Sequence, residues 1–227
     1  MCGRYASSRG AHDLAAHFDV EELPEQALPV SYNVAPTDPV PAVLHRDGAR
    51  QLRVLRWGLV PSWAKDAKGG ARLINARRDS VERKPAFRAA YQRRRCLLPA
   101  DGYYEWQSDG SGKQPYFLSA RDGGPLAMAG LYEVWAPAEG GERLWTCTVI
   151  TTEAADELGH IHDRTPLLVP PGGWARWLDP TVEDPGDLLV PGTPGLLDAW
   201  PVSPAVGNVR NDGPELVQPF ETDGALF

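Results

Sequence analysis

The N-terminal segment Met1-Cys2-Gly3-Arg4-Tyr5 contains a residue with unusual chemical potential. Cys2 directly follows the initiator methionine, and its small side chain favours removal of Met1. Removal would leave Cys2 with an α-amine and a thiol on adjacent carbons. Such an amine forms a Schiff base with an aldehyde, and the thiol can then close onto the imine carbon to give a five-membered thiazolidine. The alternative interpretation is a small residue at a frayed chain end.

The other potential metal ligands and nucleophiles lack a partner at a useful spacing. Cys96 and Cys147 lie in apolar, strand-like runs, so we expect both to be buried and inert. The odd number of cysteines and their wide spacing argue against a disulfide framework or a zinc knuckle. His160 and His162 could bind a metal from one side of a strand, but no third ligand is close in sequence. The sequence therefore predicts no metal and no cofactor.

Glu105 stands among aromatic residues in Tyr103-Tyr104-Glu105-Trp106. Burial in such surroundings disfavours the ionised carboxylate, so we expect a raised pKa. A carboxyl group of this kind can act as a general acid or base near neutral pH. The alternative is a structural partner for a basic residue.

Charge is unevenly distributed along the chain. The net charge of −7 argues against indiscriminate nucleic-acid binding. Residues 72–95 nevertheless hold nine basic residues and two acidic ones, namely Arg72, Arg77, Arg78, Arg83, Lys84, Arg88, Arg93, Arg94 and Arg95 against Asp79 and Glu82. This stretch fits either one polyanion-binding face or a solvated helix whose arginines complement its C-terminal pole.

The elements that must position these residues are short. Apolar spacing predicts helices at 11–18, 86–94 and 172–178, a loop-rich region at 179–200 and an extended tail at 201–219. Strands are predicted at 40–44, 52–57, 96–99, 103–106, 115–118, 127–135 and 144–151, the first two joined by a hairpin turn at Asp47-Gly48. We therefore expect one α+β domain over residues 1–227. It should be mainly antiparallel β, as a distorted barrel or two packed sheets, with short peripheral helices.

Composition is that of an ordinary globular protein, with 42% hydrophobic residues. No stretch reaches the apolar length of a membrane span, and no signal peptide opens the chain. These features predict a cytoplasmic protein without membrane contact.

Seven separated segments together resemble one family, the SOS-response-associated peptidase (SRAP) family. They are Met-Cys-Gly-Arg-Tyr at 1–5, Tyr-Asn-Val-Ala-Pro at 32–36, Trp-Gly-Leu-Val-Pro at 57–61, Ile-Asn-Ala-Arg at 74–77, Asp-Gly-Tyr-Tyr-Glu-Trp at 101–106, Ile-His-Asp-Arg-Thr-Pro at 161–166 and Pro-Val-Ser-Pro-Ala-Val-Gly-Asn-Val at 201–209. The resemblance implies an enzyme that captures abasic sites in single-stranded DNA as a thiazolidine crosslink through Cys2. Abasic-lyase, crosslink-reversal and self-processing peptidase activities are further possibilities that it implies.

The resemblance also implies roles for individual residues. Catalytic roles fall on Cys2 as nucleophile, on Asn75 as a hydrogen-bonding group, on Glu105 as a proton shuttle and on His162 in opening of the sugar ring. DNA-binding roles fall on Arg4, Asn33, Trp63, Arg77, Arg78, Trp106 and Arg164. The expected partner is single-stranded DNA containing abasic sites, bound by a monomer.

Two other functions fit the same residues. One is a thiol peptidase that uses Cys2 and His162, and the other is a non-covalent binder of single-stranded DNA.

Overall fold

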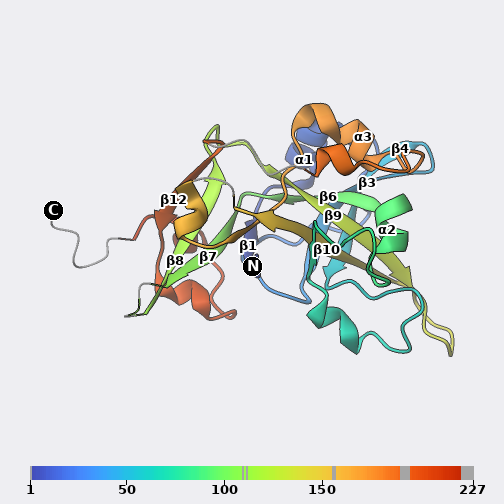
Figure 1. The fold of residues 1–227 in the computed structure, drawn as a ribbon, viewed down its shortest axis with the longest axis horizontal. Coiled ribbons are helices and arrows are strands. Elements are labelled where there is room, and N and C mark those ends of the chain that lie inside the picture. Colours follow the sequence, from blue (N-terminus) through green and yellow to red (C-terminus); the bar gives the residue numbers. More distant parts are fainter. Residues whose placement is uncertain (1, 109, 111, 155–156, 190–194, 221–227) are drawn as a thin grey trace.

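Two β-sheets make up the body of the molecule (Figure 1). The computed structural model describes residues 2–108, 110, 112–154, 157–189 and 195–220. The first sheet has five strands in the order β12-β8-β7-β1-β2, and all its pairings are antiparallel. These strands are β1 (Tyr5–Ser7), β2 (Ser31–Val34), β7 (Gly102–Ser108), β8 (Lys113–Ala120) and β12 (Leu197–Pro201).

The second sheet closes on itself. The order β10-β4-β3-β6-β9 returns to its start because β9 also pairs with β10. The ring strands are β3 (Pro39–Arg46), β4 (Ala49–Trp57), β6 (Arg95–Ala100), β9 (Leu126–Trp135) and β10 (Leu144–Glu153). Two short strands, β5 (Asn75–Arg77) and β11 (Arg164–Pro166), flank the C-terminal end of β10. The predicted α+β class is confirmed, with an irregular ring of strands beside a second sheet.

The β3–β4 hairpin follows from local turn chemistry. Asp47 and Gly48 form a two-residue loop with φ angles of 54° and 86°. Positive φ at both central positions is the requirement of a type I′ turn, whose twist matches that of paired strands. The predicted turn is therefore confirmed, and the two strands are longer than predicted because their pairing continues to Arg46 and Ala49.

Apolar side chains fill the space between the ring and the five-stranded sheet. Tyr5 of β1 and Trp57 of β4 are fully buried, with ring centroids 5.1 Å apart in an edge-to-face arrangement. Cys96 and Cys147 are buried in the same cluster, and burial raises the pKa of both thiols. The N-terminal segment thus enters the molecule between the two sheets.

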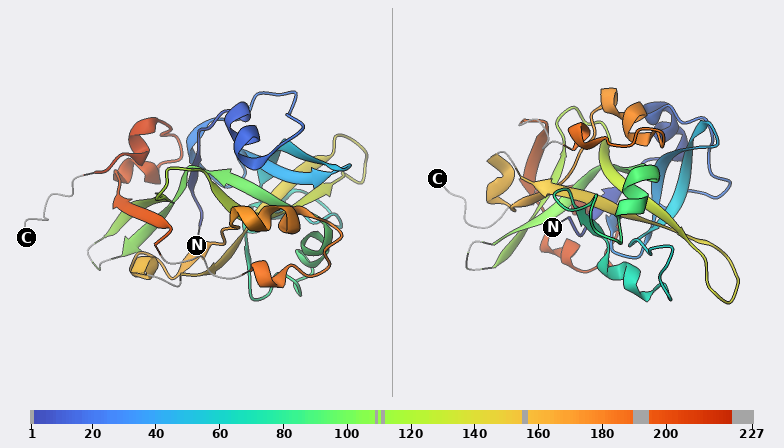
Figure 2. Two further views of the ribbon diagram at one scale, coloured as in Figure 1. Left: turned by 90° about the horizontal axis from the view of Figure 1, so that it is seen from above. Right: turned by 45° about the vertical axis from the view of Figure 1, so that its right-hand side comes forward.

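Short helices cover the ring from outside, as expected. Helices α1 (Ala11–Phe18) and α3 (Trp174–Leu178) lie beside each other (Figures 1 and 2), and the rings of Phe18 and Trp174 are 4.7 Å apart. Helix α2 (Arg88–Arg93) is shorter than the predicted 86–94 helix. Within the described part of the chain, no helix is long and apolar enough to cross a membrane.

The prediction of an extended tail at 201–219 is wrong. This segment contains two 3₁₀ turns, Pro204–Gly207 and Pro214–Val217, and it packs on the five-stranded sheet. Val206 and Leu216 bury their side chains in one cluster with Tyr104 and Phe117. The region 179–200 likewise ends in a strand, β12, which the sequence pattern did not predict.

Candidate active site

Cys2 and Asn75 meet where the five-stranded sheet approaches the ring. Cys2 lies three residues before the start of β1 and is fully buried. Asn75 opens β5, which runs parallel to β10 with Asn75 opposite Val149. The Asn75 Nδ2 group donates a hydrogen bond of 2.6 Å to the Cys2 carbonyl oxygen. Its Oδ1 atom is buried and accepts no hydrogen bond from the described residues. Met1, whose removal the sequence predicts, lies outside the described residues.

Glu105 comes from the middle of β7 and is 3% exposed. Desolvation raises the pKa of its carboxyl group from 4.5 to about 7, as its aromatic surroundings predicted. The Cys2 thiol senses this carboxylate: burial raises the thiol pKa most, and the charge of Glu105 raises it further. Cys2 is therefore a neutral thiol near pH 7, placed within electrostatic reach of a group that can hold or release a proton.

His162 lies just before β11 and faces Glu105 across the site. The distance from His162 Nε2 to Glu105 Oε2 is 3.9 Å. The Nδ1 atom accepts a hydrogen bond of 3.0 Å from the backbone N–H of Arg164, which places the proton of the neutral ring on Nε2. Partial burial lowers the pKa of the imidazole. The exposed Asp163 carboxylate is also 2.9 Å from Nδ1, and it can form an ion pair there only when the ring is protonated.

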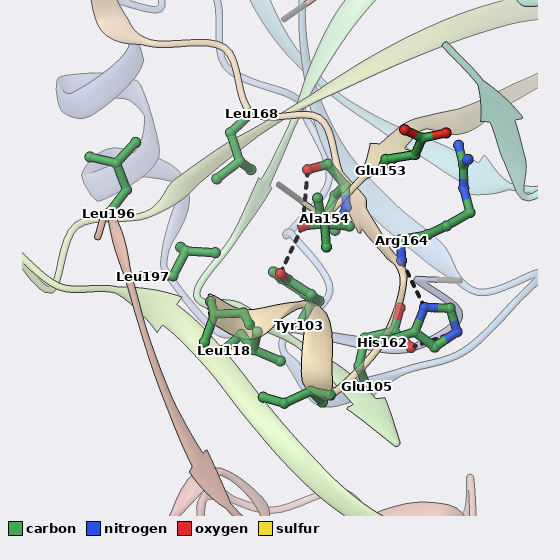
Figure 3. Close-up of a pocket in the computed structure, with 14 residues that line it drawn as sticks. Tyr103, Glu105, Leu118, Glu153, Ala154, His162, Arg164, Leu168, Leu196 and Leu197 are labelled. Atoms are coloured by element: carbon green, nitrogen blue, oxygen red, sulfur yellow. Dashed lines mark hydrogen bonds and ion pairs between the residues drawn. The ribbon is translucent and has the colours of Figure 1, made fainter. Parts of the chain in front are cut away.

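A small cavity of about 40 Å³ opens beside Glu105 and His162 (Figure 3). Its apolar wall is formed by Leu118, Leu158, Ile161, Leu168, Leu196 and Leu197. A space of this size holds no more than a few water molecules. The arrangement therefore provides a proton donor and acceptor at the edge of a largely apolar recess.

Three of the predicted DNA-binding arginines lie on one side of the site. Arg78 and Arg164 line a second, open cavity of about 260 Å³, with Asp79 at its border. Arg164 is 9% exposed, and its guanidinium donates to the backbone and side-chain oxygens of Thr151 at 2.8 and 3.1 Å. The exposed Arg77 pairs with Asp79 at 2.6 Å, which lowers the pKa of that carboxyl group.

Arg4 and Asn33 form a separate group. Arg4 donates to the Asn33 Oδ1 atom at 2.7 Å and to the Val206 carbonyl at 2.8 Å. Asn33 is 2% exposed, and its amide donates to the carbonyls of Val206, Asn208 and Asn211. In this structure Asn33 holds the chain segment that covers the five-stranded sheet.

The two predicted tryptophans differ in exposure. Trp63 is 68% exposed on the loop after β4. Trp106 lies at the edge of the cluster that contains Tyr104 and Phe117, so it packs against the protein. Of these two residues, only Trp63 presents a broad free ring to a ligand.

The arginine-rich stretch at 72–95 divides into structural and exposed members. Arg95 is 2% exposed, and its guanidinium donates to the carbonyls of Tyr91, Gln92, Trp177, Asp179 and Val182. Arg94 pairs with the buried Glu133 at 2.9 Å. Arg88 and Arg93 are exposed on α2. Arg94 and Arg95 therefore have structural roles at the end of α2, whereas the polyanion-binding interpretation of the exposed arginines stays a prediction.

Sequence reasoning missed the contact between Tyr103 and Thr165. Their hydroxyl oxygens are 2.8 Å apart at the wall of the small cavity. The available signal was the period of the strand: residues two apart share a face, so Tyr103 had to point to the same side as Glu105.

Comparisons with known proteins agree with the seven segments. The family model described as SOS response associated peptidase (SRAP) matches residues 1–209. The Bacillus subtilis abasic site processing protein YoqW is 38% identical over 223 residues, which cover 96% of this chain and 99% of that protein. The Escherichia coli abasic site processing protein YedK is 35% identical, covering 96% of this chain and all of that protein.

A relative from an animal and a solved structure extend the similarity. The Gallus gallus abasic site processing protein HMCES is 35% identical over 264 residues, covering 97% of this chain and 78% of that protein. The crystal structure of a Bacteroides thetaiotaomicron protein superposes with a TM-score of 0.83 at 26% identity, covering 97% of this chain and all of that one. By the extent of the family match and the identity to these relatives, the chain belongs to the SOS response associated peptidase family.

Proposed function

We propose that this protein processes abasic sites in single-stranded DNA and captures them covalently through Cys2 once Met1 has been removed. Relatives that align over almost the whole chain are named abasic site processing proteins. The observation that carries the chemical part is the placement of Cys2 against Asn75 and within the field of the buried Glu105.

The reaction begins with the sugar of the lesion. An abasic deoxyribose is mostly a closed hemiacetal, and opening it to the C1′ aldehyde needs proton transfer to the ring oxygen. His162 with its proton on Nε2 and Glu105 with a pKa of about 7 supply a donor and an acceptor for this step. The released α-amine of Cys2, with an ordinary pKa of roughly 8, is partly neutral at pH 7 and attacks the aldehyde carbon.

Two further steps complete the crosslink. The carbinolamine takes a proton on its hydroxyl group and loses water, and the resulting iminium ion gives up its N–H proton to form an imine. The Cys2 sulfur then bonds to the imine carbon while its proton moves, through Glu105, to the imine nitrogen. The product is a thiazolidine, and the overall change is the loss of one water. Without ring closure the same imine would permit β-elimination of the 3′ phosphate, so thiol addition protects the strand.

The state of the thiol favours this order of events over thiol proteolysis. A cysteine protease attacks with a thiolate, which requires a depressed pKa. The pKa of the Cys2 thiol is raised by burial and by Glu105. These surroundings fit a reaction in which the amine attacks first. The neutral thiol then adds and transfers its proton to the neighbouring carboxylate, so no thiolate attack is needed.

The phosphates on either side of the lesion would be held by Arg4, Arg77, Arg78 and Arg164, of which Arg78 and Arg164 line one open cavity. The exposed ring of Trp63 would stack against a base or separate neighbouring bases. Asn33 would act on DNA indirectly by orienting Arg4, and Trp106 by supporting β7. We expect the protein to act as a monomer.

The test is a denaturing gel of protein with Met1 removed, incubated with single-stranded DNA with or without an abasic site. We expect a denaturation-resistant complex with abasic DNA alone, and an intact mass of the two components less one water. Cys2→Ala, also with Met1 removed, should give an imine that borohydride traps and that promotes strand cleavage. An equally stable complex from Cys2→Ser would exclude the thiazolidine, and equal binding of intact DNA without any covalent complex would favour a simple binder.

Incubating purified protein with a Met1-retaining precursor, in the absence of an aminopeptidase, tests self-processing separately. Release of Met1 would add peptidase activity to the proposal, and a stable precursor would assign that step to another enzyme.

A further inference from the structure

The proton-transfer groups of the site belong to different sheets. Glu105 is on β7 of the five-stranded sheet, whereas His162 precedes β11 on the strand ring. Strands β7 and β11 share no backbone pairing. Besides the chain connection from β6 into β7 through Asp101, side-chain contacts between the sheets help to set their mutual position.

Among the residues that the structure describes, three hydrogen bonds join these parts of the molecule near the site. Asn75 Nδ2 donates to the Cys2 carbonyl at 2.6 Å. Gln107 Nε2 donates to the His160 carbonyl at 3.4 Å, a long bond at an exposed position. The third joins the Tyr103 and Thr165 hydroxyl groups at 2.8 Å. The first orients Cys2, and the second is weak by its length. The third is the short bond that ties β7 itself to β11.

Tyr103 and Thr165 are placed where they can control the distance between Glu105 and His162. Tyr103 is 2% exposed and precedes Glu105 by two residues, so both side chains leave the same face of β7. Thr165 follows His162 by three residues, and its backbone is held by pairing with Thr152 of β10. In Figure 3, Tyr103 lies on the cavity wall next to Glu105, with His162 nearby.

The distance between the catalytic groups needs such control. At 3.9 Å, His162 Nε2 and Glu105 Oε2 lie beyond direct hydrogen-bond distance, so their separation depends on how β7 and the segment before β11 are held. The space between Glu105 and His162 has to fit the oxygen atom of the abasic sugar that exchanges protons with both groups. Proton transfer in a preorganised site is sensitive to displacements of 1 Å or less.

We propose that Tyr103 and Thr165 are a positioning pair whose hydroxyl–hydroxyl bond sets the Glu105–His162 separation and thereby the rate of adduct formation. This inference rests on the proposed function. It assigns to the two residues a role in proton transfer that acts through Glu105 and His162, without contact with the sugar.

The test compares Thr165→Val, which removes the hydroxyl at nearly constant shape, with Thr165→Ser, which keeps it. Single-turnover rates of adduct formation with abasic single-stranded DNA are measured from about pH 5 to about pH 9. We expect Thr165→Val to react about tenfold more slowly, and Thr165→Ser to stay within about twofold of wild type. Glu105→Gln identifies the limb of the pH profile that reports Glu105, because that limb should be absent in this variant. In Thr165→Val the same limb should move to lower pH, because a looser site admits water and lessens the desolvation of Glu105.

Tyr103→Phe provides the second arm and a safeguard if Thr165→Val does not fold. It should reproduce the slower rate and the shifted limb, and the double variant should be no slower than either single one, because all three lack the same bond. Wild-type rates and an unchanged pH profile in either folded single variant would overturn the inference. Absence of adduct from the wild-type protein would instead refute the proposed function.

Discussion

Burial of the Glu105 carboxyl group should lower the free energy of unfolding at neutral pH relative to its value at acidic pH. Desolvation raises the pKa of Glu105 from 4.5 to about 7 in the folded state, and the side chain is 3% exposed. The folded state therefore holds a proton that the unfolded chain releases between these two pH values. The free energy of unfolding must fall as pH rises from about 4.5 to about 7, and the loss is complete above that range.

The size of the effect follows from the two pKa values. One pH unit corresponds to about 1.4 kcal/mol, so the difference between 4.5 and about 7 gives a destabilisation of about 3 kcal/mol at alkaline pH. Replacing Glu105 by the neutral, isosteric Gln removes this penalty. We expect Glu105→Gln to be more stable than wild type by about 2–3 kcal/mol above pH 7, with the advantage vanishing near pH 4.5.

Urea unfolding of both proteins across this pH range measures the difference directly. Glu133→Gln is a matched control, because Glu133 is 5% exposed but pairs with Arg94 at 2.9 Å. Removing that charge should destabilise the protein at neutral pH, since Arg94 loses its partner. A Glu105→Gln protein that is no more stable than wild type at pH 8, or whose advantage is the same at pH 4.5, would refute the reasoning.

Three further outcomes follow from the site and its support. Asn75→Ala removes the hydrogen bond to the Cys2 carbonyl and should slow adduct formation by about tenfold or more. It should also lower the free energy of unfolding, measured in urea, by about 1 kcal/mol. An unchanged rate would show that Asn75 does not orient Cys2. Gly102→Ala would place a Cβ atom 2.5 Å from the Leu118 carbonyl oxygen, so we expect a loss of about 1–3 kcal/mol in thermal or urea unfolding. Arg78→Ala should weaken DNA binding equally for different sequences. In fluorescence titrations, the slope of log affinity against log salt concentration should become shallower by about 1. An unchanged slope would show that Arg78 does not contact the DNA backbone.

Local chemistry made part of the fold predictable. The β3–β4 hairpin could be read from Asp47-Gly48 because a two-residue turn with positive φ angles has a narrow set of solutions. Helix α1 matched its predicted range of 11–18 because Leu14 and Phe18 have helical spacing. In contrast, β12 has an irregular pattern of partial burial, and only its pairing with β8 makes it a strand.

The segment after β12 shows the same limit. This segment was predicted to be extended, yet Val206 and Leu216 are buried in one cluster with Tyr104 and Phe117, which lie far earlier in the chain. Contacts of that range leave no local signature. Burial of Glu105 was predictable from its aromatic neighbours. The burial of Arg95 was not, because its acceptors lie on α3 and the loop after it as well as on α2.

Strand β10 pairs with β9 and β4 in its first half and with β5 and β11 in its second half. The positions of Asn75 and His162 thus both depend on one ten-residue strand, although 86 residues lie between them in the chain. Insertions in the connection from β4 to β5 would leave the pairing of β5 with β10 intact, whereas the connection from β10 to β11 contains His162 itself.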